Sequence, residues 1–200
     1  MRTDAGHPRG HPTTRGAPSG EGDRPLLTDV APIDAVLDAH AEALGRDRAG
    51  YGNHAYRVTN LCAALAPLDA EELEKVAIAA AFHDLGIWTA GTFDYLRPSS
   101  RLAVEHLLEV GRLRWADELE AMVLAHHKIS PHRGRPLVEL FRRADWVDVS
   151  RGLFTFGLPR RFLARVFSAW PSAGFHRRLV QLTLERTRTH PWSPLPMVRL

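Results

Sequence analysis

The chain has 200 residues, 44% of them hydrophobic and 24% charged, which is the composition of an ordinary globular domain. No apolar stretch is long enough to cross a bilayer, and the first residues lack a hydrophobic signal core, so we expect a cytoplasmic protein without membrane contact. The single cysteine, Cys62, excludes an intrachain disulfide and suits a reducing compartment.

The formal net charge of +3 comes almost entirely from arginine, because Lys75 and Lys128 are the only lysines. Arginine is favoured for contacts to phosphate and carboxylate groups. No predicted helix carries a long one-sided basic stripe, however, and we therefore do not expect nucleic acid as a partner.

Residues 1–25 are rich in Gly, Pro, Thr and Arg and show no hydrophobic period, so we predict a disordered tail. His7 and His11 lie in this tail and are expected to be solvated. Residues 26–200 are predicted to form one domain. Its apolar residues recur at helical spacing near residues 32–44, 53–65, 69–84, 98–111, 115–128, 136–149, 159–169 and 176–188. No convincing alternating strand pattern is present, and the predicted fold is an all-α bundle of about six to eight helices.

The third predicted helix ends in the run Ala81-Phe82-His83-Asp84-Leu85-Gly86. It opens at Asp69 with the spacing of a capping box, and Gly86 is a plausible stop. A carboxylate at the end of such an apolar helix must find a cation or several hydrogen bonds. A divalent metal ion supplies that cation, and imidazole and carboxylate are its usual ligands.

The remaining ligands are predicted from two other helices, through His54 upstream and Asp145 downstream. Asp145 stands among apolar residues that point inward, and a buried aspartate without a partner would be costly. Two imidazoles and two carboxylates balance a dication and leave room for water, which the metal makes a nucleophile. We therefore expect one divalent ion, Mn, Fe, Co, Ni or Zn, with Mg as a further candidate. His54 by itself could equally hydrogen-bond the backbone.

The order His … His-Asp … Asp on helices resembles the HD-domain superfamily of metal-dependent phosphohydrolases. The resemblance extends over about residues 51–152. It implies an HD-like helical bundle, metal ligation by His54, His83, Asp84 and Asp145, and hydrolysis of a phosphate ester.

Some members of that superfamily bind two metal ions through two additional histidines. His126-His127 resembles the second of these positions, but Ser99 stands where the first histidine would be. His106 lies two turns further along and does not fit the same position. The departure predicts a site with one metal ion.

Catalytic roles are predicted for four residues. Asp84 would orient or deprotonate the attacking water, and Arg57, His126 and Lys128 would neutralise charge on the transferred group and protonate the leaving oxygen. His126 could also be a ligand or a hydrogen-bonded core residue. On a continuous helix, neighbouring side chains project about 100° apart, so only one of His126 and His127 is expected to face the site.

Other residues near the motif are left with open alternatives. Asp148 could orient an arginine or a water, or lie at the surface. Lys128 could instead cap a helix C-terminus. Trp88, Phe93 and Tyr95 could line a pocket or belong to the core.

The predicted activity is metal-dependent hydrolysis of a small phosphorylated substrate, most plausibly a nucleotide. One alternative is hydration of a small nitrile such as cyanamide, which relatives on this scaffold perform. Another is a regulatory domain that binds metal without turnover. The fold alone does not choose among them.

Overall fold

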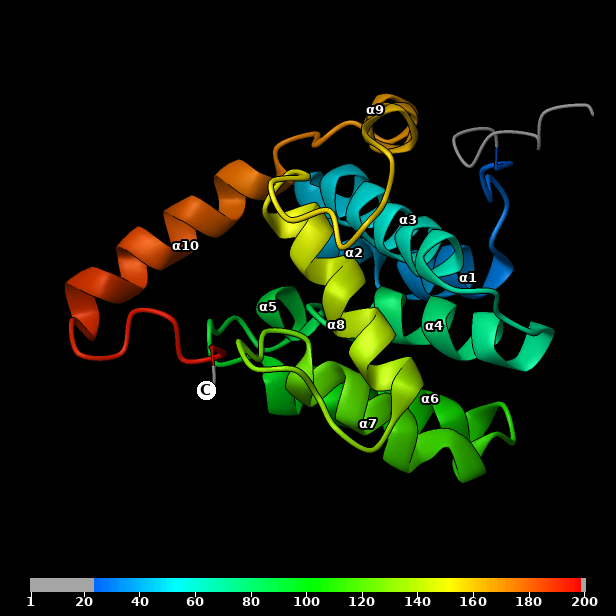
Figure 1. Ribbon diagram of the computed structural model, residues 1–200. Helices are drawn as coiled ribbons and strands as arrows, with labels where there is room; N and C mark the ends of the chain where they lie inside the picture. Colours follow the sequence, from blue (N-terminus) through cyan, green and yellow to red (C-terminus); the bar gives the residue numbers. More distant parts are fainter. Residues whose placement is uncertain (1–23, 199–200) are drawn as a thin grey trace, which may run out of the picture.

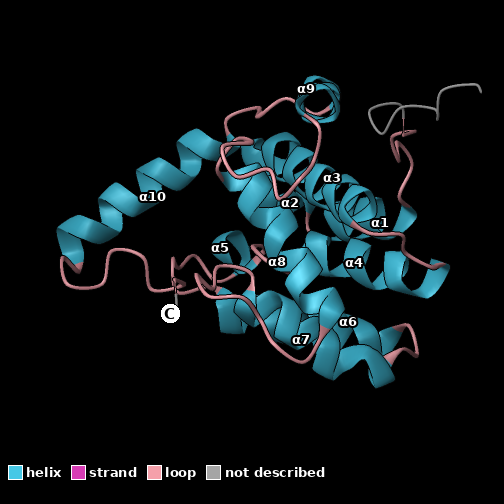
Figure 2. Ribbon diagram, viewed as in Figure 1, coloured by secondary structure: helices cyan, strands magenta, loops and turns pink. Residues whose placement is uncertain are grey.

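The structure is a computed structural model that describes residues 24–198 (Figure 1). Every regular element in this range is helical (Figure 2), which confirms the all-α prediction. The short helices are α2 (Ala41–Leu44) and α5 (Gly86–Thr89), with 3-10 turns at η1 (Gly45–Asp47) and η2 (Leu113–Trp115). The eight helices of nine or more residues in this range are α1 (Ala31–Ala39), α3 (Arg48–Leu65), α4 (Ala70–Phe82), α6 (Leu96–Glu109), α7 (Ala116–Ala125), α8 (Pro136–Val149), α9 (Arg160–Ala169) and α10 (Phe175–Thr189).

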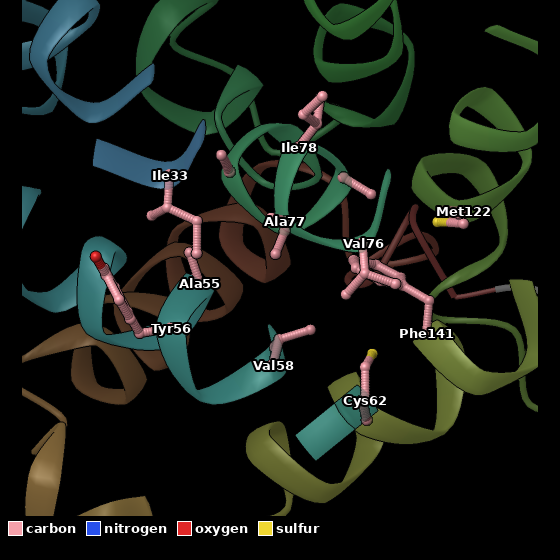
Figure 3. Packing of buried hydrophobic residues seen from close by; sticks show 14 of the residues in the cluster. Ile33, Ala55, Tyr56, Val58, Cys62, Val76, Ala77, Ile78, Met122 and Phe141 are labelled. Carbon is pink, nitrogen blue, oxygen red and sulfur yellow. The ribbon is translucent and has the colours of Figure 1, made fainter. Parts of the chain in front are cut away.

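Helix α3 packs against both α4 and α8, and α8 crosses the middle of the bundle (Figure 1). Helix α4 also packs on α1 and α7, and α6 packs along α7. Figure 3 shows the core between these helices, where Val58 and Cys62 of α3 lie near Val76 of α4 and Phe141 of α8. Cys62 is free and fully buried, as expected of a small hydrophobic residue.

The predicted capping box at the start of α4 is confirmed. Asp69 Oδ1 accepts a hydrogen bond from the Glu72 backbone N–H at 2.8 Å, and Glu72 Oε2 accepts one from the Asp69 N–H at 3.0 Å. Every residue from Val76 to Phe82 is buried. The helix ends at Phe82 with His83 as its cap, so the next two residues begin a turn at the centre of the molecule.

Gly86, which the sequence offered as a helix stop, and two glycines of α3 have a packing role. Gly50 and Gly52 lie inside α3, and Gly86 is the first residue of α5. A Cβ on Gly50 would lie 2.9 Å from the carbonyl oxygen of Ala173, and one on Gly86 would lie 2.7 Å from that of Tyr95. Gly50 and Gly86 need glycine because another backbone approaches closely, whereas a Cβ on Gly52 would lie 2.9 Å from the Leu37 side chain. None of the three interrupts or ends a helix.

Some predicted boundaries are wrong for local reasons. The first predicted helix is divided at His40, whose φ of −111° and ψ of 19° are not helical. Helix α6 begins at Leu96, so that Pro98 lies in its first turn, where its missing N–H is tolerated. Helix α7 ends at Ala125, three residues earlier than predicted, and the chain turns there. That turn changes where the following histidines point.

Helix α10 extends away from the bundle, and the chain then returns toward it (Figure 1). Met197 is buried on this return and packs against Ile87, Phe93, Tyr95 and Leu96. In the described range, no helix combines the length and the apolar character needed to cross a membrane.

Of the predicted tail, residues 1–23 lie outside the described part of the chain. Arg24, which the sequence also assigned to the tail, donates a hydrogen bond to the Ala64 carbonyl at 2.8 Å. Its own carbonyl oxygen accepts one from Arg165 Nη1 at 3.1 Å. Arg24 is therefore attached to α3 and α9.

Candidate metal centre

The four predicted ligands come together in the interior from three parts of the chain. His54 lies in α3, His83 and Asp84 form the turn between α4 and α5, and Asp145 lies in α8. All four are nearly inaccessible to water, with Asp84 the most exposed at 2%. Such burial of polar groups is costly unless they are paired with one another or with an ion.

The donor atoms of these four residues form a tight group. His54 Nε2 and His83 Nε2 are 2.8 Å apart. Asp84 Oδ2 is 3.6 Å from His54 Nε2 and 3.5 Å from His83 Nε2. Asp145 Oδ1 lies at 3.6 and 3.7 Å from the same two nitrogens. Two nitrogens and two oxygens thus converge as a metal ion would require.

The protonation of the two histidine rings follows from their other nitrogens. His54 Nδ1 donates to Asp148 Oδ2 at 2.6 Å, and His83 Nδ1 donates to the Ala80 carbonyl at 2.9 Å. Carboxylates and carbonyls only accept, so each neutral ring carries its proton on Nδ1 and turns a lone pair inward from Nε2. Two lone pairs at 2.8 Å repel each other unless a cation lies against both.

A proton bound to His83 Nε2 is a poor candidate for the cation between the two rings. Burial lowers the pKa of His83 to about 3, and the attraction of Asp84 does not offset it. The ring is therefore neutral near neutral pH. A metal ion satisfies the lone pairs without requiring the buried ring to be protonated, and the residues present fit a divalent ion.

Other buried atoms around the group also lack partners. Asp84 Oδ1, Asp145 Oδ2 and His126 Nε2 make no hydrogen bond within the protein. Buried polar atoms are normally paired, and exceptions of this kind indicate a missing ion or water. Each carboxylate thus turns one oxygen to His54 and His83 and leaves the other unpaired.

Both His126 and His127 face these unpaired oxygens, so the expectation that only one of them faces the site is wrong. His126 Nε2 is 3.3 Å from Asp84 Oδ1, and His127 Nδ1 is 3.6 Å from Asp145 Oδ2. The angular argument assumed a continuous helix, but α7 ends at Ala125 and the two histidines lie in a turn. Together with Asp145 they form a second group of donors that could hold a metal ion.

The hydrogen bonds of these two histidines differ. His126 Nδ1 donates to the Val123 carbonyl at 2.7 Å, which directs Nε2 to the centre. His127 Nε2 lies 2.8 Å from the Tyr95 hydroxyl, so Nδ1 faces Asp145. Burial would lower the pKa of His126, but the carboxylates of Asp84 and Asp145 outweigh it and raise the pKa.

The carboxylates of Asp84 and Asp145 differ in charge state. Burial raises the pKa of Asp145 to about 7, only partly offset by the histidines beside it. Burial acts in the same direction on Asp84, but His83, His126 and His54 outweigh it and hold its pKa below the ordinary range. Without a metal ion, Asp84 is the more firmly ionised of the two.

The comparison with known families agrees with this geometry. The family model described as HD domain matches residues 51–150, half of the chain. The chain belongs to the HD domain family. Neither the curated proteins nor the solved structures contain a significant match to it. Members of this family are generally metal-dependent hydrolases, and the buried His/Asp group could hold the ion such an activity requires.

Arg57 is not in the position that the sequence suggested. It is fully buried behind His54, paired with Asp148 through Nε and Nη2, and Nη1 donates to the Trp170 carbonyl at 2.9 Å. All three of its nitrogens are thus engaged by the protein. The expectation that Arg57 reaches the substrate pocket is corrected, because its guanidinium supports His54 from behind.

Lys128 follows the two histidines and is half-buried. Its described hydrogen bonds are made by the backbone. The N–H donates to the Ala125 carbonyl at 2.9 Å, and the carbonyl accepts from Arg142 Nη1 at 3.0 Å and Trp146 Nε1 at 3.2 Å. Ser99, at the position of a missing histidine, is buried and accepts a hydrogen bond from the Gly86 N–H at 2.9 Å. Its hydroxyl therefore fixes the turn that carries Asp84.

The structure decides two alternatives that the sequence left open: Asp148 is fully buried and orients Arg57, and Tyr95 contacts His127. The spacing of Asp145 and Asp148 had placed both on one face of α8. Sequence reasoning missed Phe175, whose ring stacks on that of His54 with centroids 4.1 Å apart. His106 lies against Phe82 at the other side of α4 and is in none of the donor groups found in the described residues.

Proposed function

We propose that the protein is a metal-dependent phosphohydrolase that cleaves a small phosphate ester, most plausibly a nucleotide. The ion would be held by His54, His83, Asp84 and Asp145. The observation that carries the proposal is the pair of inward lone pairs on His54 and His83, 2.8 Å apart and faced by two carboxylates. Family membership supports the reaction class.

A bound divalent ion would acidify water at neutral pH and offset negative charge on a phosphoryl oxygen. Asp84 has the position and charge to align the attacking water. Its Oδ2 belongs to the ligand group, and its buried Oδ1 has no partner. Because the pKa of Asp84 is low, Oδ1 is available as an acceptor that holds the water's hydrogen.

His126 is the candidate general acid. Its Nε2 faces the centre next to Asp84, and its raised pKa favours a proton there that can pass to the leaving oxygen. Lys128 would add positive charge near the transferred group. Arg57 is not assigned a contact with substrate, because its guanidinium is fully engaged behind His54.

Among the histidines and aspartates of the donor groups, His127 is the most accessible at 15% exposed, whereas His54, His83 and Asp145 are closed off. We therefore infer that substrate approaches from the side of His127, next to Tyr95. A centre whose donor residues are this deeply buried suits a small molecule or a single phosphoryl group and disfavours a polymer.

The test begins with metal content, for which we expect one tightly bound ion per chain. The loaded protein is then assayed for phosphate release from nucleoside monophosphates and a simple aryl phosphate. Cyanamide is included because hydration of it alone would favour the hydratase alternative. Inactivity on all of them would favour a regulatory domain, and protein that takes up no Mn, Fe, Co, Ni or Zn would overturn the proposal.

Two tightly bound ions would show that His126 and His127 are ligands and not proton donors. His106→Ala provides a matched control for histidine variants of the site, since this half-buried ring packs against Phe82 away from the centre. It should leave metal content and turnover unchanged.

A further inference from the structure

The ring of His54 is held from behind by groups that the metal site itself does not require. Asp148 is fully buried, and its Oδ2 accepts from His54 Nδ1 at 2.6 Å. Arg57 Nη2 donates a hydrogen bond to the same carboxylate oxygen, Asp148 Oδ2, at 2.9 Å. A carboxylate in this position keeps the ring proton on Nδ1 and leaves Nε2 free to bind a cation.

The support continues into a segment outside the family match. Residues 170–176 comprise the link between α9 and α10 and the first two residues of α10, and they lie against α3. The carbonyls of Trp170 and Pro171 accept from Arg57 Nη1 at 2.9 and 3.3 Å, and Phe175 stacks on the His54 ring at an interplanar angle of 18°. His176 Nε2 is 3.1 Å from the Asp148 carbonyl oxygen.

This arrangement also explains why glycine occurs at position 50 in α3. A Cβ there would lie 2.9 Å from the Ala173 carbonyl oxygen and 3.2 Å from the Phe175 nitrogen. The segment 170–176 is thus pressed against α3 one turn before His54. Asn53 Nδ2 adds a hydrogen bond to the Pro171 carbonyl at 2.7 Å.

We propose that Asp148 is a positioning residue for the metal centre, locked by Arg57 and by residues 170–176, and that it sets the tautomer and the direction of His54. The inference rests on the proposed metal site and deepens it. Asp148 does not touch the ion or the substrate. It acts by presenting a single, correctly aimed nitrogen, so its removal weakens binding at a centre whose four ligands are all still present.

The primary test is Asp148→Asn in the full-length chain, with Co²⁺ alone as the probe. The amide has the same shape but can turn its NH₂ group to His54, and it no longer neutralises Arg57. We expect Co²⁺ affinity to fall about 10- to 100-fold. The visible absorption bands of bound Co²⁺ should also change, because His54 no longer meets the ion at a fixed angle.

The matched control is Glu139→Gln, which makes the same chemical change on the same helix. Glu139 pairs with Arg142 and Arg143 near the start of α8 and contacts no ligand. Its variant should keep wild-type Co²⁺ affinity within about twofold and an unchanged spectrum, because no ligand depends on it. A similar loss in both variants would mean that the effect comes from general destabilisation of α8, and would overturn the proposal.

In the Asp148→Asn variant the buried charge of Arg57 loses its carboxylate partner, which could prevent folding. The double variant Arg57→Gln/Asp148→Asn removes that charge as well. If the double variant regains thermal stability but not Co²⁺ affinity, the positioning role is supported. Equal affinity and an unchanged spectrum in either folded variant would refute it. Wild-type protein that binds no Co²⁺ would instead refute the metal site itself, so the two failures are distinguishable.

A second readout follows the tautomer without metal. In ¹⁵N-histidine-labelled wild-type protein, His54 should show a protonated Nδ1 and an unprotonated Nε2. In the Asp148→Asn variant this pattern should be lost or become mixed, while His83, held by the Ala80 carbonyl, keeps it. An unchanged His54 signal would contradict the proposal even if stability had fallen.

Discussion

Asp145 and Asp148 lie one turn apart on α8 and are equally buried, yet their surroundings are opposite. Burial would raise the pKa of Asp148, but the hydrogen bonds from His54 and Arg57 and the charge of Arg57 outweigh it and hold the pKa below the ordinary range. Asp145 has an oxygen without any hydrogen-bond partner, and burial raises its pKa to about 7. The protein satisfies one carboxylate itself and leaves the other to be satisfied by something it binds.

The same contrast holds for the two sides of His54. On the support side, Asp148 and Arg57 are fully paired, and this side would be stable without a ligand. The other side, the ligand side, comprises His83, Asp84 and Asp145. Here the Nε2 lone pairs of His54 and His83 converge with one carboxylate oxygen each from Asp84 and Asp145, without hydrogens between them. Such a division is expected of a site built to hold an ion, because an ion would compensate the unpaired groups of the ligand side.

The largest effect should come from removing a ligand atom of the turn between α4 and α5. His83→Ala and Asp84→Ala should each reduce metal content from about one ion per chain to a small fraction of that, because a donor of the group is lost. Elemental analysis after dialysis measures it. Metal content that stays at the wild-type value in both variants would remove these residues from the ligand side.

Asp145→Asn should stabilise the metal-free protein, whereas most substitutions in a protein core are destabilising. Metal affinity should fall at least about 100-fold, because an anionic ligand is lost. Metal-free protein should become more stable by about 1–3 kcal/mol at pH 8, because an uncompensated buried charge is removed. Chemical denaturation with chelator present tests this, and destabilisation at that pH would contradict the contrast.

The stability of the metal-free wild type should depend on pH through Asp145. The pKa of Asp145 in the folded protein is about 7, above its ordinary value of 3.8. Between these two values the folded state binds more protons than the unfolded state, so stability falls as pH rises. Asp145→Asn should flatten that decrease.

His126→Ala should slow turnover by roughly 100-fold with metal content unchanged, as expected for loss of a general acid. The pH profile of kcat should lose its basic limb, since the proton that His126 supplies is gone. Loss of metal in proportion to activity would assign His126 as a ligand instead. His106→Ala serves as the control for removing an imidazole.

Replacing Glu139, near the other end of α8, should have a modest effect on stability. Burial opposes the shift, but Arg142, the His132 backbone N–H and Arg143 outweigh it and lower the pKa of Glu139 to about 2. Its contribution to stability is therefore present above its ordinary value of 4.5 and lost as pH falls toward 2. Glu139→Gln should cost about 1 kcal/mol at pH 7 and almost nothing below the folded pKa, measured by urea unfolding.

The smallest effect is expected from deleting residues 1–23. No ligand, support residue or described core residue lies in that segment, so metal content and thermal stability should be unchanged. Calorimetry and elemental analysis of the truncated protein check this. Loss of metal in a normally folded truncation would show that His7 or His11 contributes to the ligand side.

The sequence alone led to the candidate ligands. A histidine and an aspartate that end an apolar helix must find a cation or several hydrogen bonds when they are buried, and this argument led from His83 and Asp84 to His54 and Asp145. The helical periods also predicted the all-α fold, because repeats of three and four residues are a local property of the chain.

Only the tertiary structure decided the support side and the approach to the site. Asp148, Arg57 and Phe175 meet through contacts across more than 90 positions of chain, which no local pattern encodes. The orientation of His126 and His127 depended on where α7 ends, and helix ends are set by packing as much as by the residues nearby. The support side is therefore a property of the assembled bundle, because its groups are paired only after α3, α8 and residues 170–176 have come together.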